Sequence, residues 1–496
     1  MENYTKRAFS GTFIVLTLTL LAAIIGYFVR FALARNLTVY DYGLFYSVFS
    51  FLGLLGIFKS LGFDRSLGKF LPEFLHKNNI DLIKSSIVYL SLVQLITNTI
   101  VILGIYFFSK YLALNFFHDP SSIILLKLMA IAFFIDNFAM NLKFIFQGFQ
   151  KMGLYASLDF VRMVLILIFI HIGFKLNLHI LSPVYAYIIV PILLIIVFYF
   201  IFIKYVFKKF KFAKLIFDKQ EFKRISKYSL LTMIVSVAGM VLGYTDIMML
   251  TYFSGLTSVG LYSVALPTAN ILTYFPKALE GVLLPLTSEL WIKNKLAILK
   301  EGILALYKYS LIIILPPTLI LISFSDILIK YLFGVEYLEA QNALKILSFG
   351  MIFATMSSTN LHFFFGMGKP EINTKIVYTA AIFNLILNII LIPKIGIIGA
   401  ALTTLLGYII MMVMGFNKIK KILKIKLPIV IWIKIIFNGV IFISVIFFIK
   451  NIINLNIWIE VFLSLFFAFL IYIIFLFILK IITLNEIKGI YDRIAK

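Results

Sequence analysis

The sequence predicts an all-α polytopic membrane protein with about fourteen transmembrane helices. Of its 496 residues, 62% are hydrophobic and only 13% are charged, and the mean hydropathy is +1.07. A soluble domain has about 45–50% apolar and about 25% charged residues, so too few polar residues exist here to cover a water-soluble globule. Continuous apolar runs such as residues 166–170 also argue against a transmembrane β-barrel, whose strands alternate in polarity.

The fourteen spans are read from runs that approach the roughly 20 apolar residues a membrane helix needs. They lie at 10–33, 43–63, 84–108, 122–146, 155–173, 181–206, 226–252, 260–286, 303–325, 343–366, 374–393, 396–416, 428–449 and 457–480. The pair 374–393 and 396–416 has a re-entrant arrangement as its alternative, which would reduce the number of spans. The first run is too long for the apolar region of a typical signal peptide, so we expect it to be the first span.

The basic residues predict the orientation of these spans. The chain carries 45 Lys and Arg against 21 Asp and Glu, a net charge of +24. With the N-terminus inside, the inside segments hold about 33 basic residues and the outside segments about seven, as the positive-inside rule requires. We therefore expect cytoplasmic N- and C-termini in the cell membrane. Most of the positive charge is then a topology signal and not a nucleic-acid footprint.

Cofactor and metal chemistry are not indicated. The chain has no cysteine, which excludes disulfides and Cys-ligated metals. Its five histidines are scattered, and no nucleotide-binding signature is present. We therefore expect no catalytic residues, no metal site and no cofactor.

An internal repeat divides the chain into two halves. Gly26-Tyr27 matches Gly243-Tyr244, and Gly43-Leu44-Phe45 matches Gly260-Leu261-Tyr262, both at an offset of 217 residues. Six spans separate the matching segments, so both halves have the same orientation. This predicts two six-helix bundles related by a pseudo-two-fold axis along the membrane normal, with a site between them near the midplane.

The repeat also predicts the domain boundaries. Residues 1–207 form the N-terminal six-helix bundle, 208–225 a basic cytoplasmic linker, and 226–416 the C-terminal six-helix bundle. Residues 417–496 hold two additional helices and a cytoplasmic tail. The linker belongs to the basic stretch Lys204–Lys227, which we expect to act mainly as a connection and topology signal, with anionic lipid as a further contact.

Several segments resemble the polysaccharide-biosynthesis flippases of the multidrug/oligosaccharidyl-lipid/polysaccharide exporter superfamily. These segments are 34–45, 63–73, 147–151, 259–262, 366–370 and 396–401. Their order and spacing are more specific together than any one of them. The resemblance covers about residues 5–420 and implies a V-shaped pair of six-helix bundles, alternating access and a lipid-linked oligosaccharide as substrate. The last two helices are variable in that family.

Cations inside the spans are candidates for contact with the phosphate of such a substrate, because ionisable residues within a membrane are costly unless they are paired or hydrated. Arg30 also resembles the first-helix arginine of the lipid II flippases. Lys59 and Lys277 are near-equivalents in the repeat. The alternatives are snorkelling to the interface for Arg30, the cytoplasmic interface for Lys59, and an ion pair with Glu280 for Lys277.

Three acids are candidates for a coupling site or for ion pairing. Asp246, Glu280 and Asp136 all lie within spans, and the coupling ion would be Na+ or H+. Asp159 and Arg162, three residues apart, are expected to pair with each other. Asn384 and Asn388 share a helix face and are expected to join helices.

Two other functions compete with a flippase. A drug or cation antiporter of the same superfamily would line its cavity with carboxylates. A membrane-embedded glycan polymerase or ligase would need a loop with carboxylates or histidines, whereas the longest loop, around 208–223, is nearly all basic. We therefore expect a non-enzymatic transporter whose partners are a lipid-linked oligosaccharide, membrane lipid, a coupling ion and, as a further option, other glycan-assembly proteins, but no nucleic acid.

Overall fold

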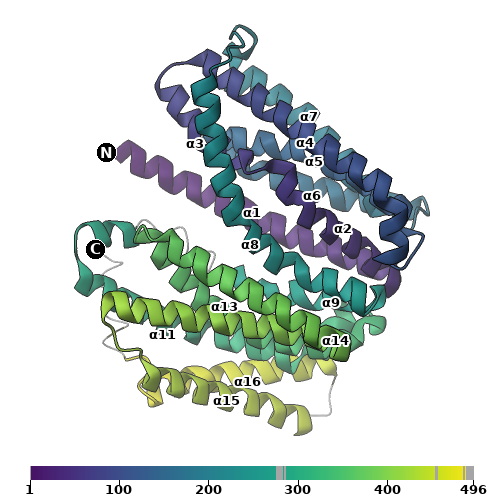
Figure 1. The fold of residues 1–496 in the computed structure, drawn as a ribbon. Coiled ribbons are helices and arrows are strands. Elements are labelled where there is room, and N and C mark those ends of the chain that lie inside the picture. The colour runs from purple at the N-terminus through teal and green to yellow at the C-terminus, as the bar shows by residue number, and fades with distance from the viewer. Residues whose placement is uncertain (1, 275–282, 284–285, 453–455, 484–485, 487–496) are drawn as a thin grey trace. The chain divides into compact units, whose positions relative to one another are not determined.

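The computed structural model describes residues 2–274, 283, 286–452, 456–483 and 486, and no strand occurs among them. Figure 1 shows the helices. The first nine are α1 (Glu2–Asn36), α2 (Val39–Ser60), α3 (Phe63–His76), α4 (Ile80–Asn115), α5 (Ser122–Gly148), α6 (Met152–Lys175), α7 (Leu181–Ile201), α8 (Lys219–Phe253) and α9 (Leu256–Asn270). The later ones are α11 (Leu296–Ser323), α12 (Ser325–Leu332), α13 (Gln341–Gly366), α14 (Pro370–Leu423), α15 (Ile429–Ile452) and α16 (Ile457–Ile478). Short helical turns cover Phe202–Val206, Lys208–Lys211, Ile271–Thr273 and Val335–Ala340.

The predicted all-α membrane fold is confirmed. Ten helices of the described chain are long and apolar enough to cross a membrane. Thirteen of the predicted runs fall on described helices, and the run 260–286 lies partly outside the described residues. Polar side chains mark several helix starts: Thr38 caps α2, Asn79 caps α4 and Asp218 caps α8 by accepting hydrogen bonds from backbone N–H groups.

α14 contains two of the predicted runs. Its backbone leaves the helical conformation at Ile395 and Gly396, and Gly396 has φ 52° and ψ −129°, a conformation that only glycine adopts readily. Beyond this break the chain folds back on itself, so that a side chain placed at Gly407 would come within 4.0 Å of the Asn384 Cβ atom. The runs 374–393 and 396–416 are therefore separate arms of a helical hairpin.

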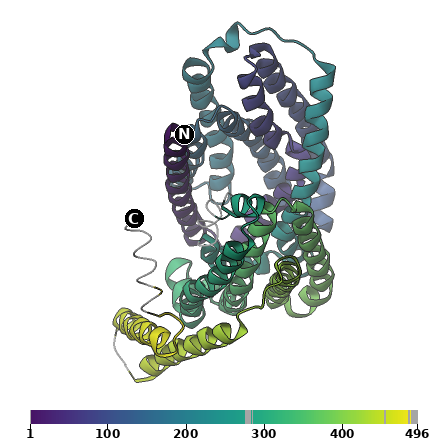
Figure 2. The ribbon, with the colours of Figure 1, turned by 90° about the vertical axis from the view of Figure 1, so that its left-hand side faces the viewer.

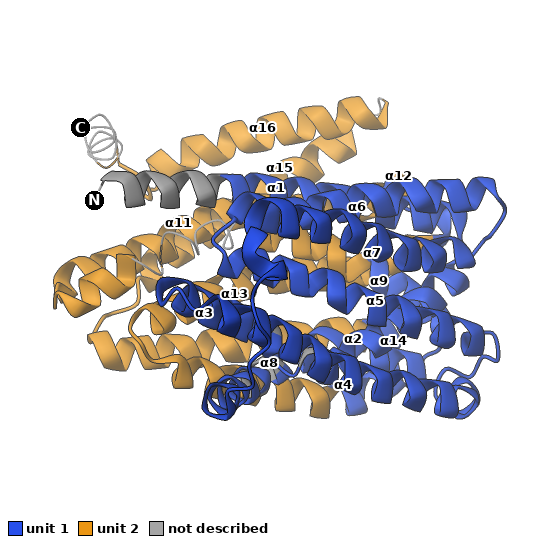
Figure 3. Cartoon of the chain, turned by 90° about the horizontal axis from the view of Figure 1, so that it is seen from above, with its two compact units in different colours: residues 1–264, 332–336, 388–397 blue, residues 265–331, 337–387, 398–496 orange. Residues whose placement is uncertain are grey.

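The contacts divide the chain into two compact units (Figure 3). Unit 1 comprises residues 1–264, 332–336 and 388–397, and unit 2 comprises residues 265–331, 337–387 and 398–496. Unit 1 thus contains α8 and the start of α9 in addition to the first six predicted spans. The repeat-based domain boundaries describe sequence equivalence and stay a prediction.

In unit 1, α2 and α9 cross where two repeat-equivalent glycines meet. A Cβ atom on Gly43 would lie 1.9 Å from the Leu256 carbonyl oxygen, and one on Gly260 would lie 2.2 Å from the Val39 carbonyl oxygen. The contact is reciprocal, since Val39 and Leu256 are themselves separated by the repeat offset of 217 residues. Such an isologous contact is what a local two-fold axis produces, and it supports the predicted repeat.

α3 is not among the predicted helices. It is amphipathic, and Phe63, Leu67, Phe70, Leu71 and Phe74 are buried along one side at the spacing of one helix face. Its 14 residues are too few to span a membrane, and it packs against α4, α5 and α8. The hydropathy runs could not reveal it, because its apolar residues form a stripe and not a continuous run.

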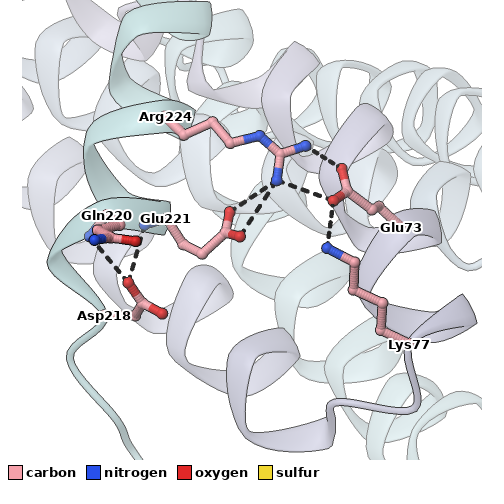
Figure 4. A network of polar contacts seen from close by, with 6 residues as sticks. All are labelled: Glu73, Lys77, Asp218, Gln220, Glu221 and Arg224. Carbon is pink, nitrogen blue, oxygen red and sulfur yellow. Dashed lines mark hydrogen bonds and ion pairs between the residues drawn. The ribbon is translucent and has the colours of Figure 1, made fainter.

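A polar network joins α3 to the start of α8 (Figure 4). Arg224 donates to both Glu73 carboxylate oxygens, at 2.9 and 2.5 Å, and to Glu221 at 3.0 Å. Lys77 donates to Glu73 at 2.8 Å. These hydrogen bonds from Arg224 and Lys77 lower the pKa of the Glu73 carboxyl from 4.5 to about 2. The network fixes the first turns of α8 to the C-terminal end of α3.

We expect this network to stabilise unit 1 by about 1 kcal/mol at neutral pH, a value limited by solvent screening at the surface. Because folding lowers the Glu73 pKa, the contribution is complete above the ordinary pKa of 4.5 and is lost as the pH falls toward about 2. The melting temperature of the Glu73→Gln protein should therefore be lower than that of the parent at pH 7, and the two melting temperatures should converge in acid. A double-mutant cycle with Arg224→Gln provides the control, and additive losses at neutral pH would contradict the coupling.

Unit 2 includes the two C-terminal helices as packed elements. The Tyr472 hydroxyl of α16 donates to the Ile312 carbonyl of α11 at 2.9 Å, and Gly439 of α15 lies against Leu315 of α11. Lys308 of α11 donates to both oxygens of Glu486, at 3.0 and 2.9 Å. The last two helices are thus fastened to α11 by polar contacts as well as by apolar packing.

Candidate cationic site in unit 1

Arg30 lies inside unit 1 in contact with two other helices. The carbon at the centre of its guanidinium group is 4.7 Å from the centroid of the Tyr46 ring on α2, an attractive cation–π geometry. Its Nη1 atom donates to the Ser263 carbonyl on α9 at 3.3 Å. Among the residues that the structure describes, no carboxylate lies within ion-pair distance of Arg30. Its charge is met by an aromatic face and a carbonyl dipole.

Lys59 and Arg162 share one carboxylate. The Lys59 Nζ atom is 3.3 Å from Oδ2 of Asp136, and the Arg162 Nη2 atom is 2.9 Å from Oδ1 of the same side chain. The three side chains come from α2, α6 and α5 and are each about one-sixth exposed or less. Two cations on one anion leave a positive excess in this part of the bundle.

This arrangement corrects one expectation from the sequence. The spacing on α6 predicts a pair between Arg162 and Asp159, three residues earlier, but Arg162 pairs with Asp136 on α5. Asp159 instead pairs with Lys143, also on α5, at 2.5 Å. The expectation was wrong because the packing of α5 on α6 brings these partners from a neighbouring helix.

Aromatic side chains connect Arg30 to the Lys59–Asp136–Arg162 group. The Phe49 ring lies 6.3 Å from Tyr46, 5.6 Å from Tyr187 and 5.5 Å from Phe133. The Lys59 Nζ atom is in turn 5.1 Å from the Phe133 ring. We call Arg30, Lys59, Arg162, Asp136, Tyr46 and Tyr187 the cationic cluster. It holds three positive charges and one negative charge.

Two donors beside this cluster lack a hydrogen-bond acceptor within the described chain. The Nε atom of Arg162 and the Nδ2 atom of Asn137, the residue after Asp136, are buried without one, and the Asp136 Oδ1 atom is a buried acceptor without a hydrogen bond. Leaving buried donors unsatisfied costs free energy, and a phosphate oxygen is an acceptor that would satisfy them. The Arg162 and Asn137 donors could thus donate to a phosphate oxygen, whereas the Asp136 oxygen could accept a hydrogen bond from a donor group.

Asp246 forms a separate polar centre in unit 1. It is only 3% exposed, and it accepts hydrogen bonds from the Tyr262 hydroxyl and the Asn388 amide, both at 2.7 Å. Tyr262 precedes Ser263, whose carbonyl accepts from Arg30. Asn388, predicted only to join helices, contacts a candidate coupling carboxylate.

The structure therefore brings Lys59 and Asp136 together and links them to Arg30 through aromatic rings. Lys277 and Glu280 lie outside the described residues. Tyr46 and Tyr187 are not among the predicted site residues, because aromatic residues are frequent throughout the chain, at 17%. The spacing from Tyr42 to Tyr46, one helical turn on α2, was the available signal. Among the described residues, no group of three His, Asp or Glu side chains could hold a metal ion.

The comparisons with known proteins identify the family. Residues 8–291 match the model of a family described as polysaccharide biosynthesis protein. The chain belongs to the polysaccharide biosynthesis protein family. This family is part of the multidrug/oligosaccharidyl-lipid/polysaccharide exporter superfamily of membrane transporters.

Relatives of this chain occur in archaea. It is 36% identical to an uncharacterized membrane protein of Methanocaldococcus jannaschii, MJ1068, over the full length of both chains. It is 24% identical to Agl15 of Haloferax volcanii, a probable low-salt glycan biosynthesis flippase, over 50% of this chain and 52% of that protein.

Several solved structures share the fold of this chain. The lipid II flippase MurJ aligns with a TM-score of 0.75 at 19% identity, covering 93% of this chain and 98% of MurJ. A multidrug resistance MATE family transporter aligns with a TM-score of 0.66 at 14% identity, over 84% and 98% of the two chains. At these identities the likeness shows the fold alone, and the fold is that of a multi-pass membrane protein.

Proposed function

We propose that this protein is a flippase that moves a lipid-linked oligosaccharide or polysaccharide precursor across the cell membrane by alternating access. The observation that carries the proposal is the cationic cluster of unit 1, where Lys59 and Arg162 pair with the single carboxylate of Asp136 and Arg30 lies against Tyr46. A lipid-linked sugar carries its charge as phosphate or diphosphate, which needs cations and hydrogen-bond donors when it leaves water. The description of Agl15 as a glycan biosynthesis flippase supports the same substrate class.

The side chains have distinct roles in this proposal. Arg30 offers a forked donor group to phosphate oxygens, and its guanidinium group lies against the Tyr46 ring. Lys59 and Arg162 add positive charge, and Asp136 keeps both in place. Lys277 is proposed as a further cation of the substrate path on the basis of the sequence repeat.

Energy coupling is proposed at Asp246. The Tyr262 hydroxyl and the Asn388 amide orient the buried Asp246 carboxylate, which could take up H+ or Na+. Tyr262 directly precedes Ser263, whose carbonyl accepts a hydrogen bond from Arg30. Asp136 suits ion pairing better than coupling, because two cations already flank it. We also propose that both termini are cytoplasmic and that the protein is not an enzyme. Other glycan-assembly proteins are proposed as further partners.

A drug or cation antiporter is the main alternative, since MATE transporters share the fold. An organic cation would be repelled by the excess positive charge of the cluster, which favours the anionic cargo. A glycan polymerase or ligase would instead change the length or linkage of the sugar.

The substrate class can be tested with the purified chain in proteoliposomes. We expect it to translocate a fluorescent lipid carrying a diphosphate-linked oligosaccharide faster than protein-free vesicles do. A matched glycolipid without phosphate and a fluorescent organic cation should cross at the protein-free rate. Transport of the cation alone would favour an antiporter, and an altered glycan in the extracted lipid would favour an enzyme. Either result would contradict the proposal.

A further inference from the structure

The basic linker between α7 and α8 is a folded surface element. Figure 2 shows the linker crossing the end of unit 1. The backbone N–H groups of Lys214 and Ile216 donate to the Asp81 and Ser85 side chains of α4, at 2.7 and 2.9 Å. Lys84 donates to the Ala213 carbonyl at 2.8 Å. The linker is therefore held by three hydrogen bonds to the first turns of α4.

Buried aromatic side chains support the linker from below. Phe207 is buried, and its ring lies 5.3 Å from Phe149 and 6.2 Å from Phe202. Ala213 is buried as well. The neighbouring residues Lys208, Phe212 and Lys214 are exposed.

The outward side of the linker combines large apolar side chains with lysines. Phe212 is 84% exposed and Phe217 is 64% exposed, whereas phenylalanine side chains are mostly buried in soluble proteins. Tyr205 and Leu215 are exposed too. Five lysines, at 204, 208, 209, 211 and 214, accompany them, and no acid occurs between positions 204 and 217. We call these nine residues the linker patch.

The position of the linker patch at the end of a predicted membrane span indicates that it contacts the surface of the bilayer. The patch begins in the last turn of the span Leu181–Val206, which has a mean hydropathy of 3.0, and continues beyond it, where the chain leaves the apolar segment. Aromatic rings are favoured at the boundary between hydrocarbon and headgroups. Lysines near that boundary are attracted by anionic headgroups, and each of them strengthens binding to such a surface by roughly fivefold. The patch therefore combines the two residue types that suit the surface of an anionic bilayer.

We propose that the linker patch is an interfacial anchor that binds the anionic lipid surface beside α7, with its aromatic side chains inserted at headgroup level. The occupant is the bilayer, because the patch pairs uniform positive charge with exposed rings at a membrane boundary. The hydrogen bonds to α4 fix the linker backbone before lipid binds, and the Phe217 ring lies 5.5 Å from the Tyr89 ring of α4, so less ordering is needed on binding. The anchor is independent of the transported substrate.

A single fluorescent label tests the anchor, because the chain has no native cysteine. Leu215→Cys carries an environment-sensitive fluorophore and leaves Phe212 in place. The full-length protein is placed in nanodiscs of zwitterionic lipid, with or without an anionic phospholipid. Contact is measured by quenching from a lipid spin-labelled near its headgroup, and water access by quenching with acrylamide. His76→Cys, an exposed site at the end of α3, is the matched control.

We expect the label at position 215 to be quenched by the spin-labelled lipid in anionic nanodiscs and shielded from acrylamide. Replacing Lys208, Lys209 and Lys211 by Gln should weaken this lipid contact by about fivefold for each lysine, and Phe212→Ser should weaken it further. The label at position 76 should respond much less to the anionic lipid. Equal water access at positions 215 and 76 in anionic nanodiscs, as expected if the patch binds a protein, would overturn the proposal. Equal lipid contact in neutral and anionic nanodiscs would overturn the charge-based recognition.

Discussion

Gly43→Ala and Gly260→Ala should each prevent the native crossing of α2 and α9. A methyl group at position 43 would sit 1.9 Å from the Leu256 carbonyl oxygen, and one at position 260 would sit 2.2 Å from the Val39 carbonyl oxygen. Both obstacles are backbone atoms, so no side-chain rotation can relieve the clash. Overpacking of this kind costs about 3 kcal/mol or more when the backbone must move. We expect a large fall in the melting temperature and in the yield of folded protein.

Gly56→Ala is the matched control for this pair. Gly56 lies on α2, as Gly43 does, but a Cβ atom there would meet nothing within 4 Å. Alanine also favours the helix over glycine by about 1 kcal/mol. The Gly56→Ala protein should therefore be at least as stable as the parent. Equal thermal stability of all three variants would show that the reciprocal glycine contact does not hold the two helices together.

Arg30→Gln should lower the rate of flipping of a lipid-linked oligosaccharide by at least about tenfold. A hydrogen bond to a charged group contributes about 1.5–3 kcal/mol, and Arg30 is the cation of the cluster without a carboxylate among the described residues. Arg30→Lys should retain part of the rate, because it keeps the charge but loses the forked donors. The additional substitution Lys277→Gln should abolish flipping. The measurement is the initial rate in proteoliposomes with matched amounts of folded protein.

Arg35→Gln is the control for a general effect of removing charge from α1. Arg35 lies at the exposed end of the same helix and donates to the Leu332 carbonyl at 3.3 Å. Its substitution should leave the flipping rate close to that of the parent. If Arg30→Gln with Lys277→Gln flips the lipid at the parental rate, these residues do not carry the substrate. Melting temperatures of all variants separate loss of transport from loss of fold, since Arg30 also binds the Ser263 carbonyl.

The conformation of the linker is a property that hydropathy and charge could not predict. The lysines between 204 and 227 indicate a topology signal and a connection between the two halves. The structure in addition fixes the linker on α4 through Asp81 and Ser85, residues far from it in the sequence. A local pattern contains no information about such a distant hydrogen-bond partner.

The sequence by itself determined the properties that depend on one segment at a time. Hydropathy summed over about 20 residues located the spans. Each membrane helix must by itself be long and apolar enough to cross the hydrocarbon region, and it pairs its backbone polar groups within its own segment. The constant offset of 217 residues predicted equivalent segments, and the glycines at 43 and 260 meet at a local two-fold crossing. The cost of a charge within a span predicted Arg30, Lys59 and Asp136 as site candidates; Lys59 and Asp136 form an ion pair, and their part in transport stays a prediction.

Tertiary structure alone decided which of these groups meet. Arg162 pairs with Asp136 and Asp159 with Lys143, because the rotation and packing of α5 and α6 bring these side chains together from different helices. The same packing surrounds Arg30 with Tyr46 and Ser263 from two further helices. The energy of an ion pair depends on the distance between the two charges and not on their separation in the sequence. A carboxylate a few ångströms away on a neighbouring helix can therefore be the partner, even when another acid lies three residues away on the same helix.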